Sequence, residues 1–219
     1  MRLRTALMSA VATLAFAPAA MAERGADGQL NLIYWQAPSI LNPYLSSGTK
    51  DLESSSIVIE PLARYNPDGV ITPYLAEDIP TVENGGVSAD LKTITWKLKA
   101  GLKWSDGSDV TSDDVVFTGE YCMHPEGGCA QLSHFEGVDK IEAVDPMTVK
   151  ITFKEARPNP YEPFVSFESP ILQKKQFANC LGAAAPTCTD ANFSPVGTGP
   201  FVVTTFKPND SIELKANEN

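Results

Sequence analysis

Residues 102–117 read LKWSDGSDVTSDDVVF, and the interpretation of this stretch decides the fold of the chain. It contains four carboxylates within nine residues: Asp106, Asp109, Asp113 and Asp114. A calcium-binding loop needs carboxylates at alternate positions, then a glycine at its sixth position and a more distant glutamate. Here Gly107 directly follows Asp106, and no glutamate falls in that register. The sequence therefore predicts no calcium loop and no other metal site.

The same stretch fits the beginning of a helix. Thr111 is followed three residues later by Asp114, which is the spacing of a capping box with aspartate in the place of the usual glutamate. Asp113 and Asp114 also oppose the positive end of the helix dipole. Asp106-Gly107 favours the turn that leaves the preceding strand. We therefore predict that the four carboxylates are structural.

The first 22 residues, MRLRTALMSAVATLAFAPAAMA, form a segment of their own. Arg2 and Arg4 precede an apolar run, which ends before the small-x-small pattern Ala20-Met21-Ala22. This is the pattern of a secretory signal peptide, and the apolar run is short for a membrane span. We predict a signal peptide over residues 1–22, with an uncleaved anchor as the alternative. The mature chain, 23–219, is then periplasmic and does not insert into the membrane.

Composition and charge narrow the classes of partner. The 219 residues are 43% hydrophobic and 20% charged, which is typical of a globular protein. The formal net charge is −10, and no basic stripe is present. Because binding to nucleic acid phosphates needs such a stripe, nucleic acid is not an expected partner.

The four cysteines form two close pairs, Cys122 with Cys129 and Cys180 with Cys188. In an oxidising compartment such pairs predict disulfides, and local pairing is the simplest of the three possible connectivities. A metal site that uses Cys122, His124, Cys129 and His134 is the alternative. Its spacing does not match a common zinc pattern.

The apolar pattern predicts a mixed α/β chain with antiparallel hairpins. Alternating residues indicate strands at 29–35 and 93–99 and hairpins at 62–75, 140–153 and 201–219. A helix is expected to follow Asp51 and to end before Pro61. Residues 163–169 are a further candidate helix. The GTGP of residues 197–200 lacks the lysine of a phosphate loop and is interpreted as a turn into the last hairpin.

Residues 98–117, LKAGLKWSDGSDVTSDDVVF, resemble the signature of the family 5 extracellular solute-binding proteins, the peptide-, nickel- and oligopeptide-binding components of ABC importers. The family form has Trp/Phe-x-Asp-Gly in a turn and Thr-Ala-x-Asp-Val at a helix start, and here Ser112 replaces the alanine. Four further stretches are similar to family motifs in family order: Leu41-Asn42-Pro43, Glu60-Pro61-Leu62, residues 73–77 (PYLAE) and residues 195–201 (PVGTGPF).

The resemblance implies a two-lobed periplasmic-binding-protein fold of type II, of which this chain carries the first lobe. Family members are about twice as long or more, so the second lobe is expected to be absent and the chain to be a fragment or a gene product cut short. Members bind a solute between lobes that close about a hinge, and then dock on a membrane permease. The resemblance therefore implies a binding protein for peptides or similar solutes, with no enzyme activity and no cofactor. Sugars, opines and metal chelates stay open as ligands.

By position in the family, two segments of the first lobe face the ligand. One is the loop Tyr34-Trp35-Gln36-Ala37-Pro38, whose aromatic rings and backbone would contact an extended ligand. The other is the signature helix near Phe117. For each aromatic residue, packing in the core is the alternative.

Two further classes stay open from the residues alone. One is a secreted hydrolase that uses Asp106 or Asp109 with Glu120 as acid and base. The other is a disulfide-stapled adhesion module, which would bind a macromolecule and need no second lobe.

Overall fold

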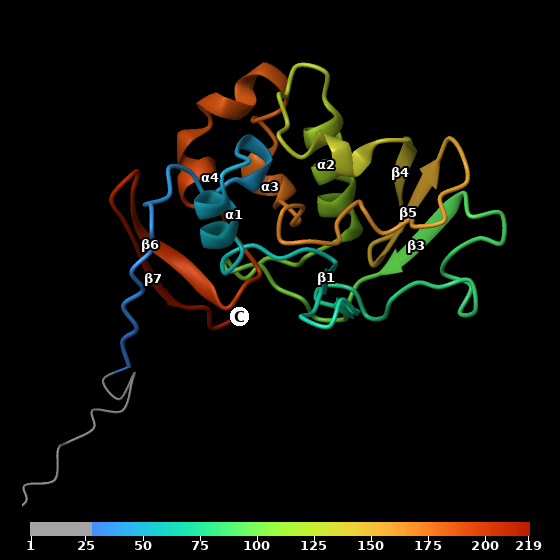
Figure 1. Ribbon diagram of the computed structural model, residues 1–219, viewed down its shortest axis with the longest axis horizontal. Coiled ribbons are helices and arrows are strands. Elements are labelled where there is room, and N and C mark those ends of the chain that lie inside the picture. Colours follow the sequence, from blue (N-terminus) through green and yellow to red (C-terminus); the bar gives the residue numbers. More distant parts are fainter. Residues whose placement is uncertain (1–27) are drawn as a thin grey trace, which may run out of the picture. The chain divides into compact units, whose positions relative to one another are not determined.

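The order of helices and strands was obtained from a computed structural model, which describes residues 28–219 (Figure 1). Residues 34–219 form one compact unit, and residues 28–33 lie outside it. The predicted signal peptide lies outside the described residues. The elements in chain order are η1 (Pro43–Leu45), α1 (Thr49–Ser55), β1 (Ala63–Tyr65), β2 (Ile71–Pro73), β3 (Thr93–Lys97), α2 (Ser112–Met123), η2 (Leu132–Phe135), β4 (Val138–Asp145), β5 (Thr148–Phe153), α3 (Lys174–Phe177), η3 (Gly182–Thr187), α4 (Thr189–Phe193), β6 (Phe201–Lys207) and β7 (Ser211–Ala216).

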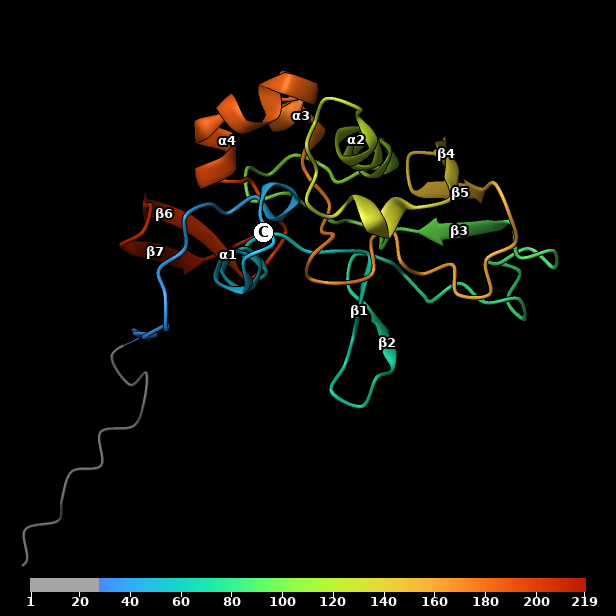
Figure 2. The same ribbon diagram turned by 45° about the horizontal axis from the view of Figure 1, so that its top comes forward.

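The strands form three separate antiparallel sheets, with orders β1-β2, β3-β5-β4 and β6-β7. The α/β class and all three predicted hairpins are confirmed. The turn of the first hairpin is made at Asn66–Gly69, where the Asn66 side chain accepts the N–H groups of Asp68 and Val70. Among residues 28–219, parallel pairing is confined to an isolated bridge between Ala63 and Val165. In Figure 2 the β1-β2 hairpin projects from the rest of the unit.

The core forms where α2 packs on the three-stranded sheet. Alternation in β3 buries Ile94 and Trp96 on one face, as predicted, and their neighbours Val149 and Ile151 on β5 are fully buried. Val115 and other apolar residues of α2 close this core, with β4 as the nearest strand. Figures 1 and 2 both show α2 beside the sheet. The sheet and the helix therefore fix the strand-to-helix turn of residues 102–112.

The predicted strand at 29–35 is wrong. Residues 28–35 form no strand, and Leu30, Leu32 and Ile33 are 70%, 76% and 100% exposed. An extended segment becomes a strand only where a neighbouring backbone pairs with its N–H and C=O groups. No sheet among residues 28–219 includes these residues.

The two other expected helices are also corrected. The helix expected after Asp51 starts earlier, at Thr49, with Gly48 as N-cap, and ends at Ser55. Beyond it, the carbonyl oxygens of Ile57 and Val58 accept N–H groups from the chain near β6 instead of continuing the helix. Residues 163–169 are not helical. Phe164 has a φ of 64°, outside the right-handed helical region, and its carbonyl accepts the N–H of Leu62.

The short helices α3, η3 and α4 were not predicted from the sequence. They follow one another over residues 174–193, and the Cys180–Cys188 disulfide closes the turn between them. Among residues 28–219, no helix combines the length and apolar character that a bilayer crossing requires.

Candidate functional site

The loop of residues 34–38 displays two aromatic side chains on the surface. Tyr34 is 41% and Trp35 is 70% exposed, and their ring centroids are 6.0 Å apart. Gln36 is exposed and Ala37 half-buried. Pro38 is buried, and its carbonyl accepts the N–H of Asn209, in the turn between β6 and β7, at 2.8 Å. The loop therefore presents its aromatic end while its last residue is anchored.

Asp51 anchors the residues that follow this loop. Its carboxylate accepts the N–H of Ser39 at 2.7 Å, the hydroxyl of Ser46 at 2.7 Å and the Lys50 ammonium at 2.8 Å. Burial of the carboxylate raises the pKa of Asp51, but these donors outweigh burial and leave its pKa below the ordinary value. The charged form of Asp51 is thus the one that the fold stabilises.

Phe117 lies elsewhere. It is 4% exposed, on the inward face of α2, with its ring centroid 6.2 Å from that of Tyr121. Its side chain is part of the core of residues 34–219, and the structure does not bring it to the surface beside Trp35. The alternative of core packing therefore describes Phe117 in this structure.

The carboxylate cluster has the geometry of a helix start. Asp114 Oδ2 accepts the N–H of Thr111 at 2.9 Å and the Trp104 Nε1–H at 3.4 Å. Its other oxygen accepts the N–H of Lys174, at the beginning of α3, at 2.9 Å. Burial raises the pKa of Asp114, while these hydrogen bonds act in the opposite direction. The predicted capping box is confirmed, and Asp114 also joins the signature turn to α3.

Asp106 and Asp109 each have partners of their own, separate from those of Asp114. The Ser108 hydroxyl donates to Asp106 at 2.6 Å and Lys175 contacts it at 3.0 Å, so that the pKa of Asp106 lies below its ordinary value. Asp109 is paired with Lys103, and Asp113 is exposed. The depressed pKa of Asp106 does not suit a general acid. Among residues 28–219, no group of three or more His, Cys, Asp or Glu side chains could hold a metal ion.

Ser112, the departure from the family motif, is buried and donates its hydroxyl to the carbonyl of Asp145, at the end of β4. The substituted residue thus ties the helix start to the sheet. An open depression of about 510 Å³ lies beside this helix start, and its lining mixes acidic and basic groups, including Asp109, Asp113 and Lys174.

The PVGTGPF motif meets the other motifs at a backbone junction. The Ser105 N–H donates to the carbonyl of Gly197 at 2.8 Å, and the Gly199 N–H donates to the carbonyl of Val58 at 2.9 Å. A Cβ atom at Gly197 would lie 1.8 Å from the carbonyl oxygen of Val58, so that only glycine fits there. The turn leads into β6, a strand, which agrees with the interpretation of GTGP as a turn.

Both predicted disulfide pairings are present, Cys122–Cys129 and Cys180–Cys188. The cysteines of the alternative metal site are therefore not free as ligands. His134 lies instead on η2, with Nε2 at 3.2 Å from a carboxylate oxygen of Glu168.

Sequence analysis did not identify a set of buried polar residues next to the aromatic loop. Asn42, Gln131 and Asn192 are 0%, 6% and 1% exposed. The Asn42 amide donates to the side-chain oxygen of Asn192, and the Gln131 amide donates to the carbonyl of Ser46. The signal that was available was Asn42 in the Leu-Asn-Pro motif, but its partners lie far away in the chain.

Comparison with known proteins gives a consistent result. Residues 70–219 match the sequence profile described as "Bacterial extracellular solute-binding proteins, family 5 Middle". Protein XP55 of Streptomyces lividans is 28% identical over 96% of this chain and 38% of its own length. The glutathione-binding protein GsiB of Escherichia coli strain K12 is 28% identical over 80% of this chain and 32% of its own length.

Among solved structures, the ABC transporter substrate-binding protein CtaP of Listeria monocytogenes superposes with a TM-score of 0.68 at 30% identity. The superposition covers 82% of this chain and 34% of CtaP. The chain thus spans about a third of the length of the proteins that it matches.

Proposed function

Because the chain belongs to family 5 of the bacterial extracellular solute-binding proteins, we propose that it acts outside the cytoplasm in an ABC importer, where it captures peptides or similar oligomeric solutes. In this proposal residues 1–22 direct export to the periplasm, and residues 23–219 are the first lobe of the binding domain. The lobe supplies one wall of the ligand groove, and a permease receives the loaded protein. The relatives GsiB and CtaP, which are named as a glutathione-binding and a substrate-binding protein, support this class of function.

The observation that carries the proposal for this chain is the exposed aromatic pair of Tyr34 and Trp35. The flat rings are solvent-exposed, and the loop that carries them is anchored at Pro38. This arrangement suits contact with an extended, partly apolar ligand. The backbone of residues 34–37 is not part of any sheet formed by residues 28–219, and in this proposal its N–H and C=O groups pair with a peptide. Glutathione, which is a tripeptide, is a small ligand of this kind.

Trp35 also provides the readout that tests the proposal. Of the three tryptophans, Trp96 and Trp104 are 0% and 1% exposed, whereas Trp35 is 70% exposed. In a nuclear magnetic resonance titration with glutathione and a set of tri- to pentapeptides, we expect the indole N–H resonance of Trp35 to move. The resonances of the two buried indoles should stay in place. Because one lobe contacts a ligand on one side only, we expect weak affinity, in the millimolar range or about −4 kcal/mol.

Two variants make the titration decisive. Trp35→Ala should remove the response of the neighbouring residues 34–38 to peptide. Tyr65→Ala is the matched control, because Tyr65 is an aromatic residue at 50% exposure on the β1-β2 hairpin, away from the loop. A peptide response that survives Trp35→Ala unchanged, or that maps to the surroundings of Asp106, would refute the assignment of this loop. Turnover of a peptide or glycoside substrate would favour the hydrolase instead.

A further inference from the structure

The segment of residues 41–46, here called the LNP segment, is held from one side by the residues that follow the first disulfide. The N–H of Ala130, next to Cys129, donates to the carbonyl of Tyr44 at 2.8 Å. The Gln131 amide donates to the carbonyl of Ser46 at 2.9 Å and to that of Pro43 at 3.2 Å. Gln131 is 6% exposed, so these bonds are shielded from water. The position of the LNP segment thus depends on the residues that directly follow the first disulfide loop, residues 122–129.

The second disulfide loop, residues 180–188, holds the same segment from another side. Asn192 is the link: its carbonyl accepts the N–H of Leu41 at 2.9 Å, and its side-chain oxygen accepts the Asn42 amide at 2.8 Å. Asn192 is fixed in turn by this loop. Its N–H donates to the carbonyl of Cys188 at 2.9 Å, and its amide donates to the carbonyl of Ala185 at 2.8 Å.

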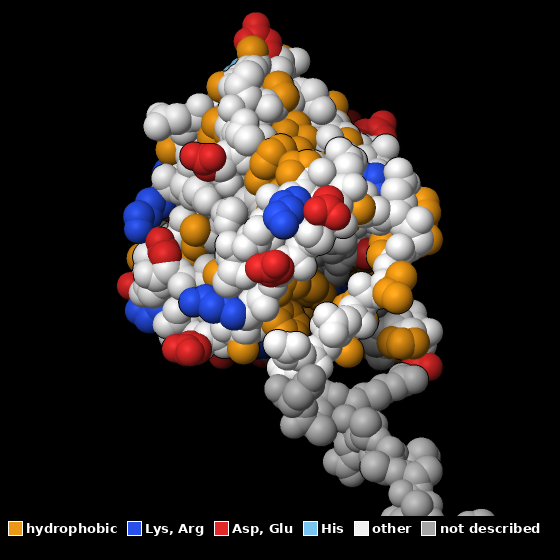
Figure 3. Space-filling view, turned by 90° about the vertical axis from the view of Figure 1, so that its left-hand side faces the viewer, with side chains coloured by type: hydrophobic (Ala, Val, Ile, Leu, Met, Phe, Trp, Pro, Cys, Tyr) orange, Lys and Arg blue, Asp and Glu red, His pale blue; other side chains and the backbone are white. Residues whose placement is uncertain are grey.

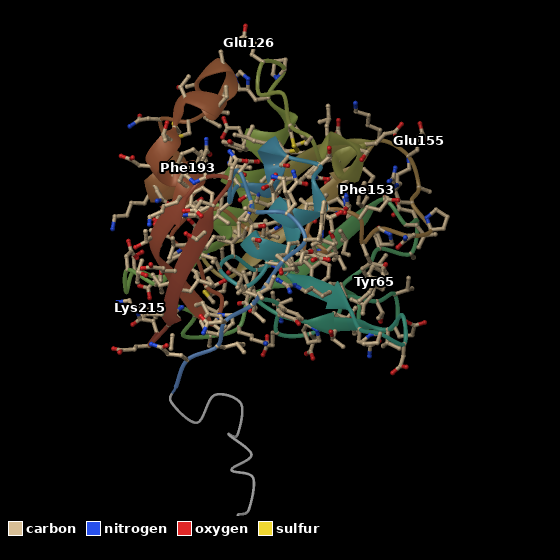
Figure 4. All side chains as sticks on the ribbon, turned by 60° about the vertical axis from the view of Figure 1, so that its left-hand side comes forward. Tyr65, Glu126, Phe153, Glu155, Phe193 and Lys215 are labelled. Carbon is tan, nitrogen blue, oxygen red and sulfur yellow. A yellow bond between two sulfur atoms is a disulfide. The ribbon has the colours of Figure 1, made fainter. Side chains whose placement is uncertain are left out.

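The two loops also touch each other directly. A Cβ atom at Gly182 would lie 2.5 Å from Cε1 of His124, so the imidazole of the first loop packs on the backbone of the second. The Asn42 amide also donates to the hydroxyl of Tyr121, the residue before Cys122, at 3.0 Å. In Figure 4 Glu126 marks the outer end of the first loop, near the orange ribbon that includes the second loop. The contacts form a closed circuit of first loop, second loop and LNP segment.

Each bridge has one protected and one accessible end. Cys122 and Cys180 are 1% and 3% exposed, whereas Cys129 and Cys188 are half-buried. We therefore expect a thiol reagent to attack each disulfide at its second cysteine, which is the less buried of the two.

We propose that the two disulfide loops form a redox-sensitive clamp on the LNP segment, which holds that segment only while both bridges are closed. The clamp opens by thiol–disulfide exchange with a dithiol reductant. A thiolate of the reductant attacks the sulfur of Cys129 or Cys188, which breaks the bridge, releases Cys122 or Cys180 as a thiolate and leaves a mixed disulfide between the reductant and the attacked cysteine. The second thiol of the reductant then attacks the reductant's own sulfur in the mixed disulfide and releases Cys129 or Cys188 as the second thiolate. Two electrons and two protons pass to the protein, which gains two thiols, and the reductant leaves as its disulfide. The proposal is independent of the ligand proposed above.

The circuit gives the clamp its distinguishing property, which is that each bridge controls contacts made by the other loop. Opening Cys122–Cys129 frees His124, which supports the second loop, and so loosens Asn192 and the Leu41 N–H bonded to it. Opening Cys180–Cys188 acts in the reverse direction on the N–H of Ala130. If the loops were independent staples, each opening would loosen only its own side.

Hydrogen exchange of single backbone amides measures this cross-effect. In Cys122→Ser/Cys129→Ser we expect the Leu41 amide to exchange roughly tenfold faster than in the oxidised chain, because local opening sets the exchange rate. In Cys180→Ser/Cys188→Ser the Ala130 amide should respond in the same way. His124→Ala, with both bridges intact, should speed both amides. The matched reference is the amide of Ile94 in the central sheet, which should change by less than about twofold.

A chain that fails to fold without a bridge is covered by a second measurement on the natural sequence. The oxidised protein is treated with increasing dithiothreitol under native conditions, and free thiols are counted by alkylation while exchange is followed. Faster exchange of both amides at a stage where only one bridge has opened supports the clamp. Unchanged exchange of the amide on the opposite side overturns it. Equal acceleration of Ile94 also overturns it, since that result indicates a general loss of stability.

Discussion

The replacement of Asp114 by asparagine tests the assignment of the carboxylate cluster most directly. The asparagine side chain keeps the shape but offers one acceptor oxygen and one NH₂ group. With its oxygen at the position of Oδ2, it still accepts from Thr111 and Trp104, and its NH₂ then faces the N–H of Lys174. One buried donor is left without an acceptor, which costs about 1–3 kcal/mol. Asp114→Ala removes both acceptors and the helix cap, and should cost about 3–5 kcal/mol.

The pH dependence of this difference has a defined sign. Because burial raises the pKa of Asp114 in the folded protein, its protonated form is favoured more in the folded than in the unfolded chain. The corresponding stability is fully present below the unfolded pKa and is lost as the pH rises through the folded pKa. The asparagine variant does not titrate there. Its deficit against the natural protein should therefore be largest at low pH and shrink as the pH rises above about 4.

The assay is urea unfolding of the natural chain, Asp114→Asn and Asp113→Asn between pH 3 and pH 7. Asp113 is the matched control, because it is the adjacent aspartate in the same helical turn and is exposed. Its replacement removes only an interaction with the helix dipole, worth about 0.3–1 kcal/mol. The reasoning is refuted if the two variants are equally stable, or if the deficit of Asp114→Asn grows with rising pH.

Three further outcomes are expected. In chemical unfolding, Gly197→Ala should lower the free energy of unfolding by roughly 3 kcal/mol or more, because its Cβ meets the carbonyl of Val58. Gly101→Ala, at a residue with a φ of 77° and open space around it, should cost only about 1–2 kcal/mol. Asp51→Asn should destabilise the fold at neutral pH, and its deficit in thermal unfolding should disappear as the pH falls below about 4, since the pKa of Asp51 is lowered in the folded state. Because the Trp35 side chain is exposed, Trp35→Ala should change the free energy of unfolding by less than about 0.5 kcal/mol relative to the natural chain. A larger loss would show that Trp35 packs on the unit.

The sequence was most informative where local rules and burial agree. The capping box of Thr111 and Asp114 and the alternation of β3 each predicted the observed element, because the side chains that set the local conformation also face the core. The hairpins were equally clear from their turn residues. Ser112 shows the limit, since its bond to the carbonyl of Asp145 depends on a strand that follows later in the chain.

The predictions that failed depend on the tertiary environment of a segment, which its own sequence does not contain. The pattern of residues 29–35 is that of a strand, yet no sheet formed by residues 28–219 includes it. The helix after Asp51 ends early, and beyond its end the carbonyl of Val58 accepts the N–H of Gly199. Phe117 carries an aromatic ring like that of Trp35, and only the fold reveals that one is buried and the other exposed. The link between Asn42 and Asn192 crosses 150 residues and leaves no local signal.

Two features of the surface are the mixture of its charges and the attachment of the β6-β7 hairpin. Figure 3 shows acidic and basic groups interspersed on one face, in line with the absence of a basic stripe in the sequence. The β6-β7 hairpin has few buried residues of its own, and it is fastened to the unit through Phe206, whose ring lies 5.1 Å from that of Phe193 on α4.

The junction of Val58 with Gly199 has a consequence for the time course of folding. Each hairpin closes over a short stretch and can form within microseconds, while the junction must wait until two residues that are far apart in the sequence have met. During synthesis on the ribosome, the carbonyl of Val58 stays without its partner until Gly199 has emerged. This junction therefore closes after the hairpins between the two residues can form, and until then the nascent polypeptide depends on staying unaggregated.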